Sequence, residues 1–266
     1  MAYIKTFENF KIDLDIRSIL RKISLYKVSD KIYSVVIKDR YLRSMVFLRY
    51  QEFYESSSDT FRGQNFKISD YIDWYKSEDS PNGVKSDIFT YAKDWSGFNL
   101  PSESIEKCIS GIVDLNTYDK IMISIINTIR ISDNSKFYLL GVDKLNIDQK
   151  EIDRLVDGTE ENVPDIIHEL AHGFYYVDPS YKRKMNTLIR SMDSEYRGIL
   201  SEMIIDWGYT KGVLNDEIQA HMSTGFVEDM YNIGFENYSK PFIDFFKSYV
   251  SNVGVYKKKI DIKWNL

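Results

Sequence analysis

The chain has 266 residues, of which 43% are hydrophobic, 15% aromatic and 28% charged. This composition excludes a disordered chain and provides enough apolar surface for one large domain or two small ones. The formal net charge is −5 at pH 7, and charges of both signs are mixed along the sequence. A nucleic-acid partner is therefore not expected.

Export and membrane insertion are not expected either. Residues 1–5 lack the apolar core and small cleavage-site residues of a secretory signal. The most apolar run, Ile121 to Ile131, is interrupted by polar residues and is too short to span a bilayer. The single cysteine, Cys108, excludes an internal disulfide and fits a reducing compartment. We therefore expect a cytoplasmic protein, with Cys108 as a buried, inert thiol and residues 257–259 as a solvated tail.

The first part of the chain, residues 1–132, is expected to form an aromatic-rich, mostly helical α+β region. The elements predicted are a strand over 31–38, helices over 41–55, 69–76 and 102–108, and an apolar element over 118–131. Aromatic side chains at helical spacing are interpreted mainly as core, with a binding groove as the alternative. They are Tyr50, Phe53, Tyr54, Tyr71, Trp74, Tyr75 and Trp95. No motif assigns a chemistry to this region.

The second part, residues 133–266, carries more information. The elements predicted are a strand over 136–141, a helix over 148–156 that ends at Asp157 and Gly158, a long amphipathic helix from Met185 to Met203, and a helix over 215–222. The whole chain is therefore predicted to be α+β and mainly helical.

A further helix is expected around His168-Glu169-Leu170-Ala171-His172, an H-E-x-x-H sequence. Side chains four residues apart project from one face of a helix, so His168 and His172 can share one metal ion. Glu169 then lies beside an open coordination position, where it can take a proton from a metal-bound water. Chance explains the pattern poorly, because the chain has only three histidines. The alternative is that both histidines simply fill a helix face.

The surrounding residues favour a helix with one buried face. Apolar residues from Ile167 to Phe174 follow i, i+3, i+4, i+7 spacing, which leaves the adjacent stripe, with both histidines, for a cleft. Pro164 suits the first turn, and Asp178 followed by Pro179 indicates the end of the helix.

A strand shortly before an H-E-x-x-H helix resembles the zincin metallopeptidases. In that family the edge strand of a small sheet pairs with an extended peptide above the zinc. The resemblance implies zinc as the cofactor and a protein or peptide as the substrate. It also implies that the backbone of Phe137 to Gly141 holds the substrate by strand addition, although a plain core strand fits these residues equally well.

A catalytic zinc site needs a third protein ligand. Asp178 stands where the metzincin pattern places its last ligand, but Tyr175 occupies the position of the glycine which that pattern requires, so Asp178 is interpreted as a turn residue. Glu217, in the sequence D-E-I-Q-A, resembles the distant glutamate ligand of the gluzincins, with a spacing like that of lethal-factor-type and clostridial-neurotoxin-type domains. We therefore expect His168, His172 and Glu217 to hold the metal.

The third histidine and one tyrosine complete the predicted site. His221 falls one helical turn after Glu217 and is expected to orient that carboxylate or to stabilise an oxyanion. The alternatives are that His221 is itself the ligand, or that the two residues form an ordinary surface ion pair. The resemblance makes Tyr209 the candidate for a phenol that hydrogen-bonds the oxyanion. The predicted catalytic residues are thus Glu169, Tyr209 and His221.

Two functions fit these residues. The leading hypothesis is a zinc metalloendopeptidase with Glu169 as its base, and the alternative is a catalytically silent zincin-like binding protein with a structural metal. The lysine-, isoleucine- and tyrosine-rich composition resembles that of H-E-x-x-H proteins from tailed phages, which implies the host cytoplasm if the chain is phage-encoded. The cleaved sequence and the oligomeric state do not follow from the residues.

Overall fold

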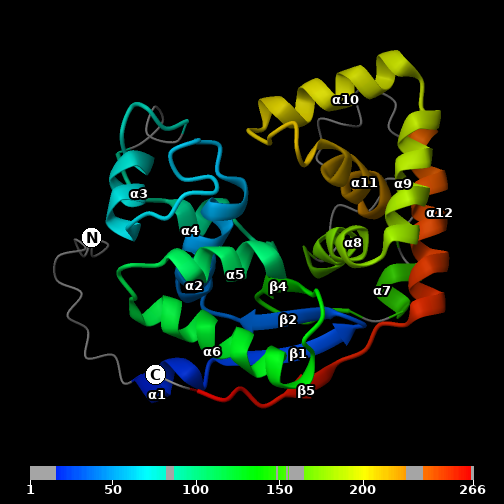
Figure 1. Ribbon diagram of the computed structural model, residues 1–266. Coiled ribbons are helices and arrows are strands. Elements are labelled where there is room, and N and C mark those ends of the chain that lie inside the picture. The colour runs from blue at the N-terminus through cyan, green and yellow to red at the C-terminus, as the bar shows by residue number, and fades with distance from the viewer. Residues whose placement is uncertain are drawn as a thin grey trace, which may run out of the picture.

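The computed structural model describes residues 16–81, 87–147, 149–153, 155, 165–225 and 236–264. This part of the chain is a mainly helical α+β fold in which helices surround one five-stranded sheet (Figure 1). The predicted fold class is therefore confirmed. The expected boundary near residue 132 falls between a helix and a strand, and strands from both sides of it join in the same sheet.

The sheet consists of β1 (Ile23–Ser29), β2 (Ile32–Ile37), β3 (Phe98–Pro101), β4 (Tyr138–Val142) and β5 (Lys258–Ile260). Their order across the sheet is β3-β4-β2-β1-β5. Strands β2 and β4 run parallel, with Ser34 opposite Leu140, whereas the other neighbouring pairs are antiparallel. Strands β3 and β5 are thus the two edges of this sheet.

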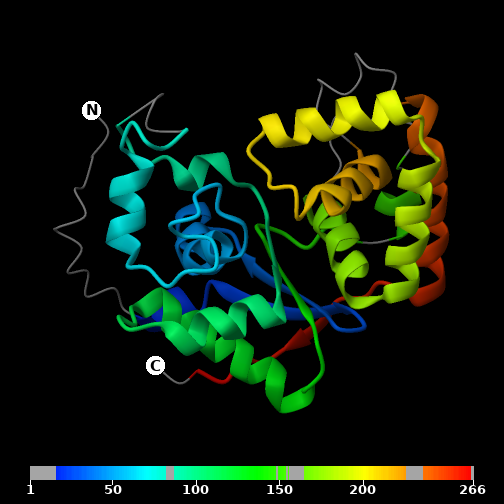
Figure 2. The ribbon, with the colours of Figure 1, turned by 45° about the horizontal axis from the view of Figure 1, so that its top comes forward.

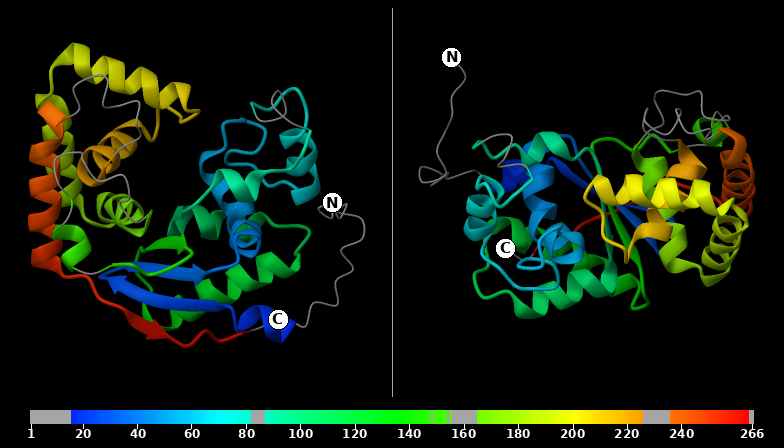
Figure 3. Two further views of the ribbon diagram at one scale, coloured as in Figure 1. Left: turned by 180° about the vertical axis from the view of Figure 1, so that it is seen from behind. Right: turned by 90° about the horizontal axis from the view of Figure 1, so that it is seen from above.

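The helices form two groups that meet at the sheet (Figures 2 and 3). The first group comprises α1 (Ile16–Leu20), α2 (Arg40–Glu55), α3 (Ile68–Tyr75), α4 (Tyr91–Asp94), α5 (Ser102–Gly111) and α6 (Thr117–Ser132). The second comprises α7 (Gln149–Asp153), α8 (Asp165–Val177), α9 (Pro179–Ser191), α10 (Ser194–Asp206), α11 (Leu214–Thr224) and α12 (Glu236–Val253).

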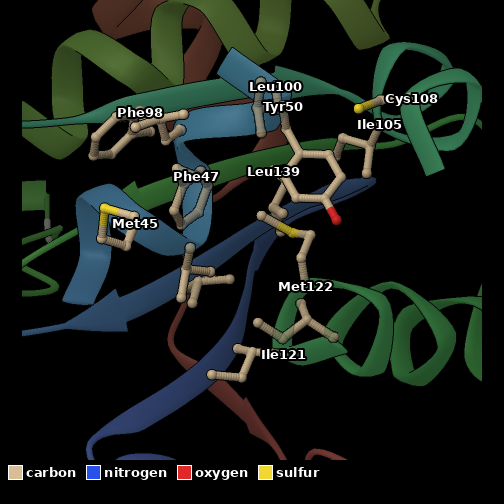
Figure 4. Packing of buried hydrophobic residues seen from close by; sticks show 14 of the residues in the cluster. Met45, Phe47, Tyr50, Phe98, Leu100, Ile105, Cys108, Ile121, Met122 and Leu139 are labelled. Carbon is tan, nitrogen blue, oxygen red and sulfur yellow. The ribbon is translucent and has the colours of Figure 1, made fainter. Parts of the chain in front are cut away.

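A separate hydrophobic cluster packs against each face of the sheet, because successive side chains of a strand point to opposite faces. On β4, Leu139 packs with residues of α2, α5 and α6, whereas Tyr138 packs with residues of α8, α9, α11 and α12. Gly141 leaves room for the ring of Phe47, because a Cβ at position 141 would lie only 2.5 Å from its Cζ atom. Phe47 in turn stacks on Phe98, with ring centroids 5.1 Å apart (Figure 4).

Most predicted elements are confirmed within one to three residues. The matches are β2 for 31–38, α2 for 41–55, α3 for 69–76, α5 for 102–108, α6 for 118–131, β4 for 136–141 and α11 for 215–222. Helix α7 covers part of the element predicted over 148–156, whose end at Asp157 and Gly158, like Pro164, lies outside the described residues.

The single long helix predicted from Met185 to Met203 is wrong. Helix α9 ends at Ser191 and α10 begins at Ser194. The break has a local cause, because the side chain of Asp193 accepts hydrogen bonds from the backbone amides of Glu195 and Tyr196, at 2.9 and 3.2 Å. This N-cap stabilises a new helix start inside a continuous apolar pattern.

The expectation that Phe137 to Gly141 presents a free edge is also wrong. Strand β4 hydrogen-bonds to β2 on one side and to β3 on the other, so it is the core strand of the alternative interpretation. The edge next to it is β3, which has only four residues and ends in Pro101. So short a strand gives almost no periodicity signal in the sequence.

Three smaller expectations concern exposure. Cys108 is 1% exposed and lies in the cluster under α2, as predicted. Lys257, Lys258 and Lys259 are exposed, but the last two belong to β5 and so are part of the sheet rather than a tail. Within the described residues, no helix has the length and apolar character needed to cross a membrane.

Candidate metal centre

Helix α8 carries the H-E-x-x-H sequence and packs directly on the sheet. The predicted apolar stripe is confirmed, since Ile167, Leu170, Ala171 and Phe174 are all buried. Gly173 lets the helix approach β2 closely, because a Cβ at this position would lie 2.9 Å from Cδ1 of Ile32. The helix is thereby fixed with its two histidines facing α11.

The two imidazoles of α8 bring their Nε2 atoms to 3.3 Å from each other. Each ring is held at its other nitrogen by a residue of α11. Nδ1 of His168 lies 3.1 Å from Oγ1 of Thr224, and Nδ1 of His172 lies 2.9 Å from Oδ1 of Asp216. The alternative that the histidines merely fill a helix face does not account for this paired arrangement.

These contacts determine which nitrogen of each ring can bind a metal. The hydroxyl of Thr224 donates to the carbonyl oxygen of Ala220 at 2.7 Å, so its oxygen accepts a hydrogen bond from Nδ1 of His168. The carboxylate of Asp216 likewise accepts one from Nδ1 of His172. In the neutral rings the Nε2 atoms then carry the lone pairs, so both can face one cation, either a metal ion or the proton of a hydrogen bond between the rings.

Helix α11 adds a carboxylate to this pair. Glu217 is 4% exposed, and its Oε2 lies 3.8 Å from Nε2 of His172. That oxygen is buried and has no hydrogen-bond partner among the described residues. An unpartnered buried carboxylate oxygen is costly in a folded protein, which points to a ligand at this position.

The ligand atoms of His168, His172 and Glu217 all lie within 4.8 Å of one another, so this buried group could hold a metal ion. In a tetrahedral zinc site with ligand distances of about 2.1 Å, neighbouring ligand atoms are about 3.4 Å apart. Two of the three separations, 3.3 Å and 3.8 Å, lie close to that value, and the third is at most 4.8 Å.

Burial makes this group electrostatically unusual. Burial, together with repulsion from His221 and His172, holds the pKa of His168 well below its usual value, so its ring stays neutral. Burial also raises the pKa of Glu217 to about 8 despite the attraction of His172. The carboxylates of Asp216 and Glu217 raise the pKa of His172 to about 10 against the effect of its burial. A divalent cation would compete with these protons for the same atoms.

The side chain of Glu169 projects from α8 toward the segment that enters the edge strand β3. Its side chain is buried at 8% exposure, and burial raises its pKa to about 7, partly offset by the charge of His172 and a hydrogen bond from Asn99. Gly97, just before β3, makes room for it, since a Cβ there would lie 2.6 Å from Oε1 of Glu169. Asn99 is itself oriented by the hydroxyl of Tyr138, which donates to Oδ1 of Asn99 at 2.5 Å.

His221 lies beside the group rather than on the surface. Its ring centroid is 4.7 Å from that of His168, and its Nε2 is 3.8 Å from Oε2 of Glu217. Both Glu217 and His221 are largely buried, at 5% and 14% side-chain exposure, so the alternative of an ordinary surface ion pair is wrong. Burial and the charge of His172 lower the pKa of His221 to about 3, which leaves a neutral ring.

Tyr209 follows α10, and its ring is partly buried against the cluster under α8. Burial raises its pKa well above the usual value, and Glu217, Glu55 and Glu169 contribute to the rise. Its hydroxyl therefore stays protonated and can act as a hydrogen-bond donor. Tyr209 and His221 line the same cavity.

Asp178 has the structural role that was predicted for it. Its Oδ1 accepts hydrogen bonds from the backbone amides of Ser180 and Tyr181 at 2.6 and 3.3 Å, so it caps α9. The hydroxyl of Tyr249, on α12, donates to its other oxygen. It is not part of the buried group formed by His168, His172 and Glu217.

Sequence reasoning missed several contacts of this site. Asp216 and Thr224 orient the histidines, and Gly97 and Asn99 position Glu169. Only Asp216 carried a signal, because an acidic residue directly before a candidate ligand on a helix can reach the neighbouring ring. The other three depend on how distant segments pack together.

Comparison with known proteins gives no further guidance. No protein-family model, no curated protein and no solved structure matches the chain.

Proposed function

We propose that the protein is a zinc-dependent metallopeptidase. The observation that carries the proposal is the convergence of two Nε2 atoms and one unpartnered carboxylate oxygen, from His168, His172 and Glu217, in a buried group. Two nitrogen donors and one oxygen donor with an open fourth position suit zinc, and Glu169 stands next to them as a base. Zincin and gluzincin metallopeptidases, which the motifs resemble, use this donor set.

A zinc ion in this group would polarise a substrate carbonyl and make a water molecule more acidic. Glu169 then accepts the proton of the attacking water and passes it to the departing amine. Burial favours both steps, because it raises the pKa of Glu169 toward neutrality, where a carboxylate can both take and release a proton. The hydroxyl of Tyr209, which stays protonated, is the proposed hydrogen-bond donor to the developing oxyanion, with His221 beside the metal group.

The edge strand β3 is the proposed binding surface for the peptide backbone. Among the described residues, β3 pairs on one side only, with β4, and the segment that enters β3 passes Glu169 at Gly97. An extended peptide that paired with the free side would run past the metal group and present a peptide bond to the base.

The first experiment is metal analysis combined with a cleavage assay. Purified protein should contain about one zinc ion per chain, and it should cleave a mixed peptide pool in a reaction that chelation stops and zinc restores. Glu169→Gln should keep the zinc and lower cleavage by at least about 100-fold. A fully active Glu169→Gln protein would exclude Glu169 as the base.

Alanine variants separate the candidate ligands. Glu217→Ala should lose zinc at concentrations where the wild type is saturated, whereas Asp178→Ala should keep it. Loss of zinc in His221→Ala but not in Glu217→Ala would make His221 the third ligand. Bound zinc without any cleavage, together with unfolding on chelation, would instead support the silent binding protein with a structural metal.

A further inference from the structure

A cavity of about 690 Å³ opens beside the candidate metal centre. His221 and Tyr209 line the wall nearest the proposed ligands. The opposite wall consists of the C-terminal end of α2, parts of α3 and the segment around Trp95. The cavity therefore lies between the two groups of helices, which face each other above the sheet in Figure 1.

The lining of this cavity is rich in carboxyl groups. Carboxylates of Glu52, Glu55, Asp94 and Asp206 line it, and none of the lining residues in the described part of the chain is a lysine or arginine. Glu52 has tyrosine and serine side chains as hydrogen-bond partners, and Glu55 has the amide of Gln51, so these partners are neutral. Burial raises the pKa of Glu52 and of Glu55, the latter with a further contribution from Glu217.

Gln51 contributes an unfulfilled hydrogen-bond acceptor to the same wall. Its side chain is 2% exposed, its Nε2 donates to Glu55, and its Oε1 has no hydrogen-bond partner among the described residues. A buried carbonyl oxygen without a donor is destabilising, so a ligand that brings an N–H group would stabilise it.

Aromatic rings form much of the remaining surface. The lining includes Trp74, Trp95 and Trp207 as well as Tyr75 and Tyr209. Aromatic faces attract cations and also pack against aliphatic stems. Carboxylates, a free carbonyl oxygen and aromatic rings together fit a cationic group that carries several N–H donors on an apolar stem.

We infer that this cavity is a specificity pocket for an arginine or lysine side chain of the peptide substrate. This inference rests on the proposed function, because it assigns the pocket to a peptide bound at the metal group. The pocket begins at His221 and Tyr209, beside that group. A peptide bond held next to Glu169 would place a nearby side chain within reach of the carboxylates. Acidic side chains would find no lysine or arginine partner among the described lining residues, and purely apolar ones would leave the acceptor of Gln51 unpaired.

Small amides test the pocket without any cleavage. Binding of argininamide and of its uncharged counterpart citrullinamide to the zinc-loaded protein is measured by ligand-observed NMR. Argininamide should bind about tenfold more tightly, as expected for a charge-assisted contact. Glu55→Gln should remove this difference, and Gln51→Met should weaken argininamide binding. Glu195→Gln, an exposed carboxylate at the start of α10, should change neither.

Two outcomes overturn the inference: equal binding of the two amides by the wild type, or unchanged selectivity in Glu55→Gln. A peptide pool then separates the inference from the proposed function. Cleavage without preference for a basic residue near the cut bond contradicts the pocket alone. Selective binding of argininamide by a protein that cleaves nothing contradicts the peptidase and leaves a cation-binding pocket.

Discussion

Nδ1 of His172 lies 2.9 Å from Oδ1 of Asp216, the residue directly before the proposed ligand Glu217. One helix, α11, thus supplies both the carboxylate proposed to bind the metal and the carboxylate that orients a proposed metal-binding ring. Gln219 holds Asp216 in turn, since its Nε2 donates to the same oxygen at 3.0 Å. Partners of this kind fix the tautomer of the ring and raise its basicity.

The first prediction follows from this contact. Asp216→Ala should lower the affinity for zinc by about 10- to 100-fold, because the His172 ring loses the acceptor that directs its Nε2 lone pair to the metal. Competition with a chromophoric chelator measures the affinity. The matched control is Asp244→Ala, an exposed carboxylate on α12, which should bind zinc like the wild type. Equal affinities for both variants would show that Asp216 does not support the metal.

The second prediction concerns Gly97. In Gly97→Ala the new Cβ would overlap Oε1 of Glu169, at 2.6 Å, and the flexible carboxylate would have to move. Zinc content and thermal stability should stay close to those of the wild type, while cleavage falls by at least about tenfold because the base is displaced. In the control Gly198→Ala, nothing lies within 4 Å of the new methyl group, so cleavage should be unchanged. An active Gly97→Ala protein would contradict the assigned position of the base.

The third prediction separates stability from metal binding at Asp178. Asp178→Ala should lower the free energy of unfolding by about 1 kcal/mol, because α9 loses its N-cap, without reducing zinc affinity. Urea unfolding and a zinc titration measure the two quantities. Loss of zinc in this variant would restore Asp178 as a ligand and exclude the gluzincin-like arrangement.

The fourth prediction is a pH dependence at the same residue. Although burial opposes it, hydrogen bonds from Ser180 and Tyr249 hold the pKa of Asp178 below its ordinary value of 3.8. Its charge therefore stabilises the fold above about pH 3.8, and this contribution is lost as the pH falls through the lower folded-state pKa. Asp178→Asn should be less stable than the wild type at pH 6, and the difference should shrink as the pH approaches 3. A difference that is independent of pH would contradict this assignment.

The fifth prediction concerns Cys108. Burial raises the pKa of its thiol to about 12, and the side chain is 1% exposed, so it should not react with a thiol reagent in the native protein. Reaction should begin only in denaturant, at the concentration where circular dichroism reports unfolding. Rapid labelling of the native protein would contradict the burial of this residue.

The sequence allowed much of the helical structure to be predicted, because helices such as α6 repeat apolar residues with the helical period. The pair His168 and His172 could be predicted for the same reason, since four residues fix their relative position within one helix. Glu217 followed from a resemblance and not from local geometry. The break at Asp193 was missed because the apolar pattern continues across it, although an aspartate can start a helix there.

The remaining parts of the site depend on tertiary packing. Gly97 and Asn99 reach Glu169 only because β3 adds to β4, and four residues of strand leave no periodic signal. The pocket residues Glu55 and Trp207 come from opposite groups of helices. No pattern within either segment relates it to the other, so their proximity could not be predicted from the sequence.

The strand order has a consequence for how the chain folds. Strand β4 inserts between β2 and β3, and β5 pairs with β1, where Ile260 lies opposite Leu25. The sheet thus joins residues from near both ends of the described chain, so its closure has a large entropic cost and a high contact order. On the ribosome, β1 and β2 emerge long before their other partners, β5 and β4. The nascent chain must therefore keep two apolar strand edges from aggregating until the last strand has been synthesised.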